Sequence, residues 1–132
     1  RVFPDMSVEE NLLMGTIPIG DKHADEDMQR MFELFPRLKE RRNQRAMTMS
    51  GGEQQGVAIA RALLNAPDVI LADEPTGNLD PDTTLDVMKL LRNISENGTA
   101  VLMATHNYTL MQKYPSRIAN CKNGTVVCSN ME

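Results

Sequence analysis

Apolar residues at helical spacing dominate the first half of the chain. In ADEDMQRMFELFP, Met28, Met31, Phe32 and Phe35 fall on one face of a helix. Residues 50–65 carry a longer pattern, with VAIARALL as its apolar face. We therefore expect two amphipathic helices here, with the methionine-rich stripe packed in a core or an interface rather than used as a ligand site.

A shorter helix is predicted ahead of these two, over residues 8–14. Ser7 is a favourable N-cap, and Glu10 three positions later completes a capping box. Between the two longer helices, RLKERRNQR places five basic residues from Arg37 to Arg45. This cluster reads as a solvated helical face, and the alternative is a docking surface.

The second half of the chain alternates short apolar strands with helices. Residues 69–72 form a predicted buried strand, residues 81–97 a helix, and AVLMATH a second buried strand. After a short helix, RIANCKNGTVVCS predicts a β-hairpin that turns at Asn123 and Gly124. A strand, a helix and another strand in this order indicate a parallel sheet with a right-handed crossover.

Length and charge narrow the class of protein. The chain has 132 residues, which is enough for one domain with a modest core. We expect an α/β domain with a helical subdomain over residues 1–48 and an α/β part over residues 49–132. A formal net charge of −4 and the absence of tryptophan argue against nucleic acid as a partner. Cys121 and Cys128 are expected to be reduced thiols in the hairpin, and no apolar run is long enough to span a bilayer, which favours a cytoplasmic location.

The segment MSGGEQQ is a candidate anion site. Ser50, Gly51 and Gly52 stand directly before a helix. Glycines let backbone N–H groups approach a ligand closely, and the helix N-terminus carries partial positive charge. The alternative is a flexible N-cap loop without a ligand.

Carboxylates at the end of a strand form a second candidate site. VILADEP ends a buried strand with Asp73 and Glu74, and His106 ends the strand AVLMATH. The carboxyl ends of neighbouring parallel strands meet at one edge of a sheet, where ligands gather. Asp73 suits a magnesium ion, and Glu74 suits an attacking water, as general base or as orienting group. Asp80 follows in the tight loop TGNLD.

The order SGGEQQ, VILADEP, GNLD, MATH resembles the ATP-binding cassette family of transporter ATPases. The resemblance implies ATP and Mg²⁺ as cofactors, a head-to-tail dimer with a second ATPase subunit, and transmembrane permease subunits as partners. By resemblance, the signature loop, which contacts ATP held by the opposite subunit, consists of Ser50, Gly51, Gly52 and Glu53. Asp73 and Glu74 end the Walker B strand, Asp80 belongs to the D-loop at the dimer interface, and His106 is the switch histidine that contacts the γ-phosphate.

The chain departs from the family pattern in two places. Gly56 stands where arginine or another large residue is usual, which puts the start of the helix in question because glycine costs about 1 kcal/mol inside a helix. None of the eight glycines is followed by Lys and then Ser or Thr, as a Walker A loop requires. We therefore expect a C-terminal fragment of a nucleotide-binding domain: a partial P-loop NTPase fold with a mostly parallel sheet that lacks the Walker A strand. By itself such a chain is expected to have no ATP turnover.

Different parts of the chain resemble two different branches of the family. Residues 1–55 are similar to the ATPases of branched-chain amino acid transporters, and residues 57–132 to the cell-division ATPase, with the seam at Gly56. The expected function is the ATP-hydrolysing part of a branched-chain amino acid transporter, located on the inner face of the bacterial plasma membrane. The alternatives are a cell-division ATPase and an engineered or recombined chimera without turnover.

A missing strand would leave an open edge. In the family's sheet, the strand leading into Walker A lies between the AVLMATH strand and the C-terminal strands. Val101, Leu102 and Met103 are therefore expected to expose an unpaired edge, which is an aggregation hazard. Either the hairpin closes onto this edge or two chains pair through it, and we expect self-association.

Overall fold

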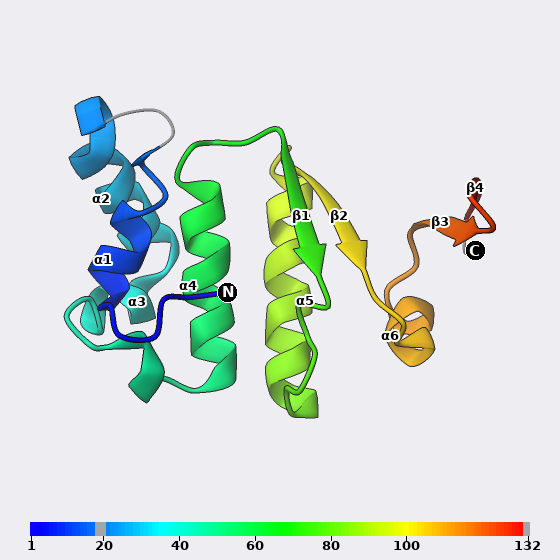
Figure 1. Cartoon of the computed structure of the whole chain (residues 1–132), viewed down its shortest axis with the longest axis horizontal. Helices are drawn as coiled ribbons and strands as arrows, with labels where there is room; N and C mark the ends of the chain where they lie inside the picture. The colour runs from blue at the N-terminus through cyan, green and yellow to red at the C-terminus, as the bar shows by residue number, and fades with distance from the viewer. Residues whose placement is uncertain (18–20, 131–132) are drawn as a thin grey trace.

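A computed structural model describes residues 1–17 and 21–130 of the chain (Figure 1). Its first part is helical. The elements are α1 (Val8–Leu13), the short 3₁₀ helix η2 (Asp21–His23), α2 (Ala24–Leu34), α3 (Pro36–Glu40), the 3₁₀ helix η3 (Ala46–Thr48) and α4 (Gly51–Leu63). The capping box predicted at Ser7 and Glu10 is confirmed at the start of α1.

The methionine-rich stripe of α2 lies in a helical core, as predicted. Met28, Met31 and Phe32 are buried in one cluster with residues of α1 and α4, among them Leu12 and Val57. The basic segment after α2 is largely solvated, and its Arg42 forms an ion pair with Glu9 of α1. Apolar burial on one face of each helix therefore holds this part together.

The second part contains a parallel strand pair backed by a helix. Its elements are β1 (Val69–Asp73), α5 (Pro81–Glu96), β2 (Ala100–Ala104) and α6 (Tyr108–Lys113). The strands β1 and β2 run parallel, in register from Val69 opposite Ala100 to Asp73 opposite Ala104. A second core cluster joins Ile70 of β1 and Leu91 of α5 to Ile59 of α4. Because α4 contributes to both clusters, it connects the helical and the α/β parts.

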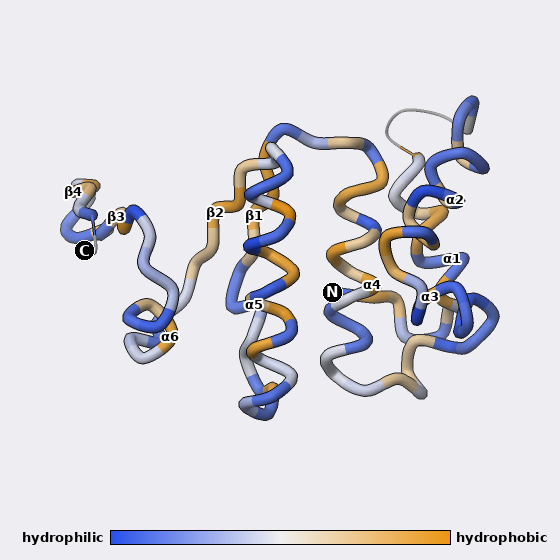
Figure 2. Tube along the Cα trace, turned by 180° about the vertical axis from the view of Figure 1, so that it is seen from behind, coloured by the Kyte–Doolittle hydropathy of each residue, from blue (hydrophilic) through white to orange (hydrophobic). Residues whose placement is uncertain are grey.

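The prediction that both strands are buried is wrong for one of their two faces. Ile70, Val101 and Met103 face the second cluster, but Leu71 is 75% exposed and Leu102 59% exposed. Side chains alternate between the faces of a strand, and within the described residues helices pack on one face only. Figure 2 shows that β1 and β2 consist mainly of hydrophobic residues.

The predicted C-terminal hairpin is confirmed as β3 (Arg117–Lys122) and β4 (Thr125–Asn130). Asn123 and Gly124 both have positive φ, at 51° and 74°, as an Asn-Gly turn of this type requires. Cys121 and Cys128 are exposed free thiols. Among the described strands, β3 pairs with β4 and not with β2, and Figure 1 shows the hairpin beyond α6. The hairpin therefore does not close the open edge of β2.

Candidate functional site

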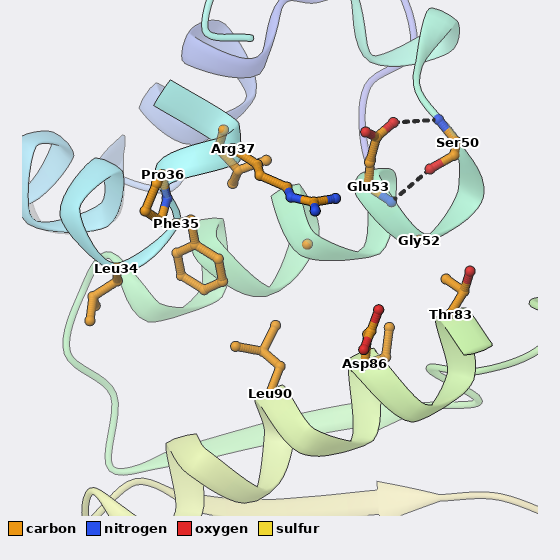
Figure 3. Close-up of a pocket in the computed structure, with 13 residues that line it drawn as sticks. Leu34, Phe35, Pro36, Arg37, Ser50, Gly52, Glu53, Thr83, Asp86 and Leu90 are labelled. Carbon is orange, nitrogen blue, oxygen red and sulfur yellow. Dashed lines mark hydrogen bonds between the residues drawn. The ribbon is translucent and has the colours of Figure 1, made fainter. Parts of the chain in front are cut away.

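The first group of predicted site residues lies at the N-terminus of α4. Ser50 is its N-cap: the Ser50 hydroxyl accepts a hydrogen bond from the Glu53 amide at 3.3 Å, and the Glu53 carboxylate accepts one from the Ser50 amide at 2.9 Å (Figure 3). Arg41 also contacts Glu53, at 3.0 Å. The hydrogen bond from the Ser50 amide is the main cause that holds the pKa of Glu53 below its usual range. Glu53 is therefore an ionised carboxylate that fixes the position of Ser50.

Close packing requires a glycine at position 52 and leaves little room beside Gly51. A Cβ on Gly52 would lie 2.1 Å from Cγ2 of Thr83, and one on Gly51 would lie 3.1 Å from Cδ2 of Leu79. The first turn of α4 therefore packs directly on the start of α5. The N–H groups of the first residues of a helix have no partner within the helix, so those of Gly51 and Gly52 are placed to donate to an anion.

Asp80 caps the neighbouring helix. Its Oδ1 accepts a hydrogen bond from the Thr83 amide at 3.0 Å, and the Thr83 hydroxyl donates to its other carboxylate oxygen. The bond from the Thr83 hydroxyl is the main cause that lowers the pKa of Asp80. Thr83 therefore connects Asp80 to Gly52, and the only sequence signal for this link is the Asp-Pro-x-Thr start of a helix.

The second group lies where β1 and β2 end. His106 Nδ1 lies 2.6 Å from Glu74 Oε1, and the His106 amide donates to the same oxygen at 2.9 Å. The Thr105 hydroxyl donates to the other oxygen of Glu74 at 3.3 Å. These bonds, first of all the one from the His106 side chain, hold the pKa of Glu74 below its usual range. The expectation that the two strand ends bring Glu74 and His106 together is met in the structure.

The backbone of Glu74 is unusual. Its φ is 44°, in the left-handed region that residues other than glycine rarely adopt. The Glu74 amide donates to the carbonyl of Ala104 at 2.9 Å, so the ladder between β1 and β2 extends to this residue. Strained backbone of this kind clusters at functional sites, where surrounding bonds hold it in place.

Asp73 ends β1 with an exposed carboxylate. Within residues 1–17 and 21–130, no group of three or more His, Cys, Asp or Glu side chains is arranged to hold a metal ion. Magnesium in nucleotide sites commonly takes one or two carboxylates, with phosphates and water completing its shell. The exposed Asp73 carboxylate fits one position in such a shell, whereas the carboxylate of Glu74, the next residue, is bonded to Thr105 and His106.

A hydrogen bond links the site residues at the N-terminus of α4 (Ser50, Gly51, Gly52 and Glu53, the α4 group) to those at the ends of β1 and β2 (Asp73, Glu74 and His106, the β1 group). Gln55 of α4 donates from Nε2 to the carbonyl of Pro75, directly after Glu74, at 2.5 Å. Gln55 lies inside SGGEQQ and Thr105 directly before His106, and these positions are the only sequence signal for their contacts.

A cavity of about 410 Å³ lies beside the α4 group, between α3, α4 and α5 (Figure 3). Its wall includes Arg37, Glu53, Gly56, Asp86 and Leu90.

Gly56 does not delay the start of its helix. It lies inside α4, which begins at Gly51. A Cβ on Gly56 would meet no atom within 4 Å.

Comparison with known families and proteins gives one consistent result. The family described as "ABC transporter" matches residues 1–77. "Cell division ATP-binding protein FtsE" of Bacillus subtilis is 41% identical over 129 residues, which are 96% of this chain and 56% of that protein. "High-affinity branched-chain amino acid transport ATP-binding protein BraG" of Pseudomonas aeruginosa is 40% identical over 127 residues, 96% of this chain and 54% of that protein. The chain therefore spans about half the length of the curated relatives it matches.

Solved structures agree on the fold. A nucleotide-free ATP-binding cassette from an ABC transporter superposes with a TM-score of 0.84 at 24% identity, covering 98% of this chain and 57% of that one. A dimeric cassette in a post-hydrolysis state, bound to ADP and Pi, superposes with a TM-score of 0.75 at 29% identity, covering all of this chain and 60% of that one. The fold is thus that of an ABC ATPase cassette, with helices and a parallel strand pair.

Proposed function

Since the chain belongs to the ABC transporter family, we propose that it is part of an ATP-binding and ATP-hydrolysing subunit that powers a membrane permease. The observation that carries this proposal is the Glu74–His106 contact at the ends of two parallel strands, with Asp73 next to it. Among residues 1–17 and 21–130, the structure contains no candidate for a membrane-spanning helix. We place the assembled subunit on the inner face of the bacterial plasma membrane, against its permease.

The α4 group is proposed to contact ATP held by a second ATPase subunit. The Ser50 hydroxyl accepts from the Glu53 amide, so its own hydrogen is left to donate to a phosphate oxygen. The amides of Gly51 and Gly52 add donors at the helix N-terminus. Glu53 would repel a phosphate, and its proposed part is to hold Ser50 in place. Asp80 would lie at the interface between the subunits, where it fixes the start of α5.

The β1 group is proposed to act on the attacking water. Asp73 would hold Mg²⁺, which supplies charge stabilisation at the phosphates. A lowered pKa keeps Glu74 ionised at neutral pH and makes it a weak base, which favours orienting the water over removing its proton. Oε1 of Glu74 accepts from the His106 side chain and amide, and Oε2 accepts from the Thr105 hydroxyl, which leaves Oε2 a lone pair to accept a hydrogen bond from the water. The His106 side chain would leave Glu74 to approach the γ-phosphate.

The test uses this chain joined to an N-terminal segment that carries G-x-x-x-x-G-K-[ST]. Glu74→Gln is expected to lower ATP turnover on the order of 100-fold while ATP-driven dimer closure, followed by gel filtration, persists. The matched control is Glu33→Gln, which changes an exposed acidic residue of α2 whose carboxylate accepts a hydrogen bond from Gln29; this variant should retain turnover. A Glu74→Gln protein that stays monomeric at saturating ATP contradicts the assignment. The isolated chain should hydrolyse no ATP, because it carries no Walker A pattern.

We further propose a branched-chain amino acid permease as the partner, selected by residues 1–48. The similarity to BraG supports this choice. A cell-division partner is the second candidate, supported by the similarity to FtsE at nearly the same identity. A mosaic joined at Gly56 would combine both. A pull-down of the completed protein with each of the two membrane partners discriminates between these proposals. Recovery with the cell-division partner alone would overturn the proposal of an amino acid permease.

A further inference from the structure

Both oxygens of the Glu53 carboxylate are occupied by donors. Oε2 accepts a hydrogen bond from the Ser50 amide at 2.9 Å, and Oε1 lies 3.0 Å from Nη1 of Arg41. The Glu53 side chain is 24% exposed, so its charge is partly withdrawn from water. A carboxylate in the first turn of a helix stabilises the helix, but it also repels an anion that approaches the same N–H groups. The α4 group therefore carries a charge that opposes its own proposed ligand.

Arg41 reaches Glu53 from a neighbouring helix. It is the C-cap of α3, where its amide donates to the Leu38 carbonyl at 3.2 Å. Leu38 is buried in the helical core, so the packing of α3 fixes the position of Arg41. Figure 3 shows that Arg37, one turn earlier, also extends toward Glu53. The Ser50 amide is the main cause that lowers the pKa of Glu53, and the charges of the two arginines lower it further.

We propose that Arg41 is a positioning residue for ATP held by a second subunit, because it neutralises Glu53 and leaves the N-terminus of α4 free to bind phosphate. This inference rests on the proposed role of the α4 group in contacting that ATP. The pair of Glu53 and Arg41 contributes no net charge, so the N–H groups of the helix and the Ser50 hydroxyl determine how the site attracts an anion. Without Arg41, a full negative charge would lie beside the bound phosphates.

The contribution of Arg41 is expected in nucleotide binding rather than in stability. Its side chain is 42% exposed, and exposed ion pairs contribute little to the free energy of unfolding. Closure of a dimer over ATP would exclude water from the N-terminus of α4, and charges interact more strongly where water is excluded. An unpaired Glu53 carboxylate would then weaken ATP binding far more than it weakens the fold.

Changing the charge of this pair tests the proposal in the completed protein described above, with Glu74→Gln as the parent so that little ATP is consumed. The measured quantity is the ATP concentration that gives half of the maximal dimer closure. Arg41→Gln leaves Glu53 unpaired and should raise this concentration on the order of tenfold. Glu53→Gln keeps an oxygen that can accept from the Ser50 amide and should not raise it. The variant with both changes is neutral again and should return to within about twofold of the parent.

Arg42→Gln is the matched control, because it removes the same charge from the next residue, whose ion-pair partner is Glu9 of α1. It should leave the ATP concentration for closure unchanged. Rescue by the second change separates charge compensation from a structural role. If Arg41 only held α3 against α4, the variant with both changes would be at least as impaired as Arg41→Gln, and that result would overturn the proposal. A defect of equal size in Arg42→Gln would overturn it as well.

A measurement without nucleotide separates this inference from the proposed function. Carbon-13 NMR of the glutamate carboxyl groups follows the titration of Glu53 in the chain alone. The pKa of Glu53 should rise in Arg41→Gln and stay the same in Arg42→Gln, and an unchanged value in Arg41→Gln would overturn the inference. Failure of the parent to close with ATP would overturn the proposed function and this inference with it. Closure of the parent with the same ATP requirement in Arg41→Gln would overturn this inference alone.

Discussion

Gly56 lies inside α4 (Gly51–Leu63), where the helix gains nothing from a glycine. Its φ is not positive, and a Cβ placed on it would meet no atom within 4 Å. Alanine at this position therefore meets no steric cost and makes no new packing contact. What changes is backbone entropy, since an unfolded chain with glycine has more conformations to lose on folding.

The expected stabilisation by Gly56→Ala is about 0.5–1 kcal/mol, the difference between glycine and alanine inside a helix. For a chain of this size, that gain corresponds to a rise in melting temperature of about 2–4 °C. Urea denaturation followed by far-UV circular dichroism measures it, at a protein concentration low enough to keep the chain monomeric. The slope of free energy against urea should stay the same.

Gly52 provides the matched control in the same helix. Its added Cβ would lie 2.1 Å from Cγ2 of Thr83, and Thr83 cannot move freely because its amide and hydroxyl are bonded to Asp80. Gly52→Ala is expected to destabilise the fold by about 1–3 kcal/mol. A neutral or destabilising Gly56→Ala at unchanged slope would refute the reasoning, as would a Gly52→Ala protein as stable as the wild type.

Two further outcomes follow from polar contacts. Asn11→Ala should lower the free energy of unfolding by about 2–3 kcal/mol in thermal unfolding, because buried Asn11 forms hydrogen bonds with the backbone of Phe3, Met6 and Ser7. A decrease below about 0.5 kcal/mol would contradict the inference that Asn11 holds the N-terminal segment in place. Since the pKa values of Glu53, Glu74 and Asp80 are lowered by folding, their stabilisation is present at neutral pH and is lost as pH falls through the folded-state pKa values. Urea titrations at a series of pH values should show stability dropping below about pH 4, and a rise there would contradict this sign.

The candidate site shows which of its features the sequence could predict. Glu74 and His106 were expected together because two parallel strands end at one edge, and the pattern of apolar runs was enough to predict those strands. The surroundings of Gly51 and Gly52 depend in part on tertiary structure. Their freedom to approach a ligand follows from residue type, but their contacts with Leu79 and Thr83 depend on how α4 crosses the start of α5.

Local signals determined the elements of this fold. The capping boxes of Ser7 with Glu10 and Ser50 with Glu53 join residues three apart, and the Asn123-Gly124 turn joins adjacent strands, so short-range chemistry specifies them.

The tertiary structure alone decided which faces of those elements are covered. An apolar strand reads the same whether helices pack on one side or on both, and here Leu71 and Leu102 remain exposed because α5 covers only the opposite face. The direction of the N–H and C=O groups of Val101 and Met103 likewise depends on the pairing of β2 with β1. This pairing joins residues about thirty positions apart, so no local sequence pattern specifies it.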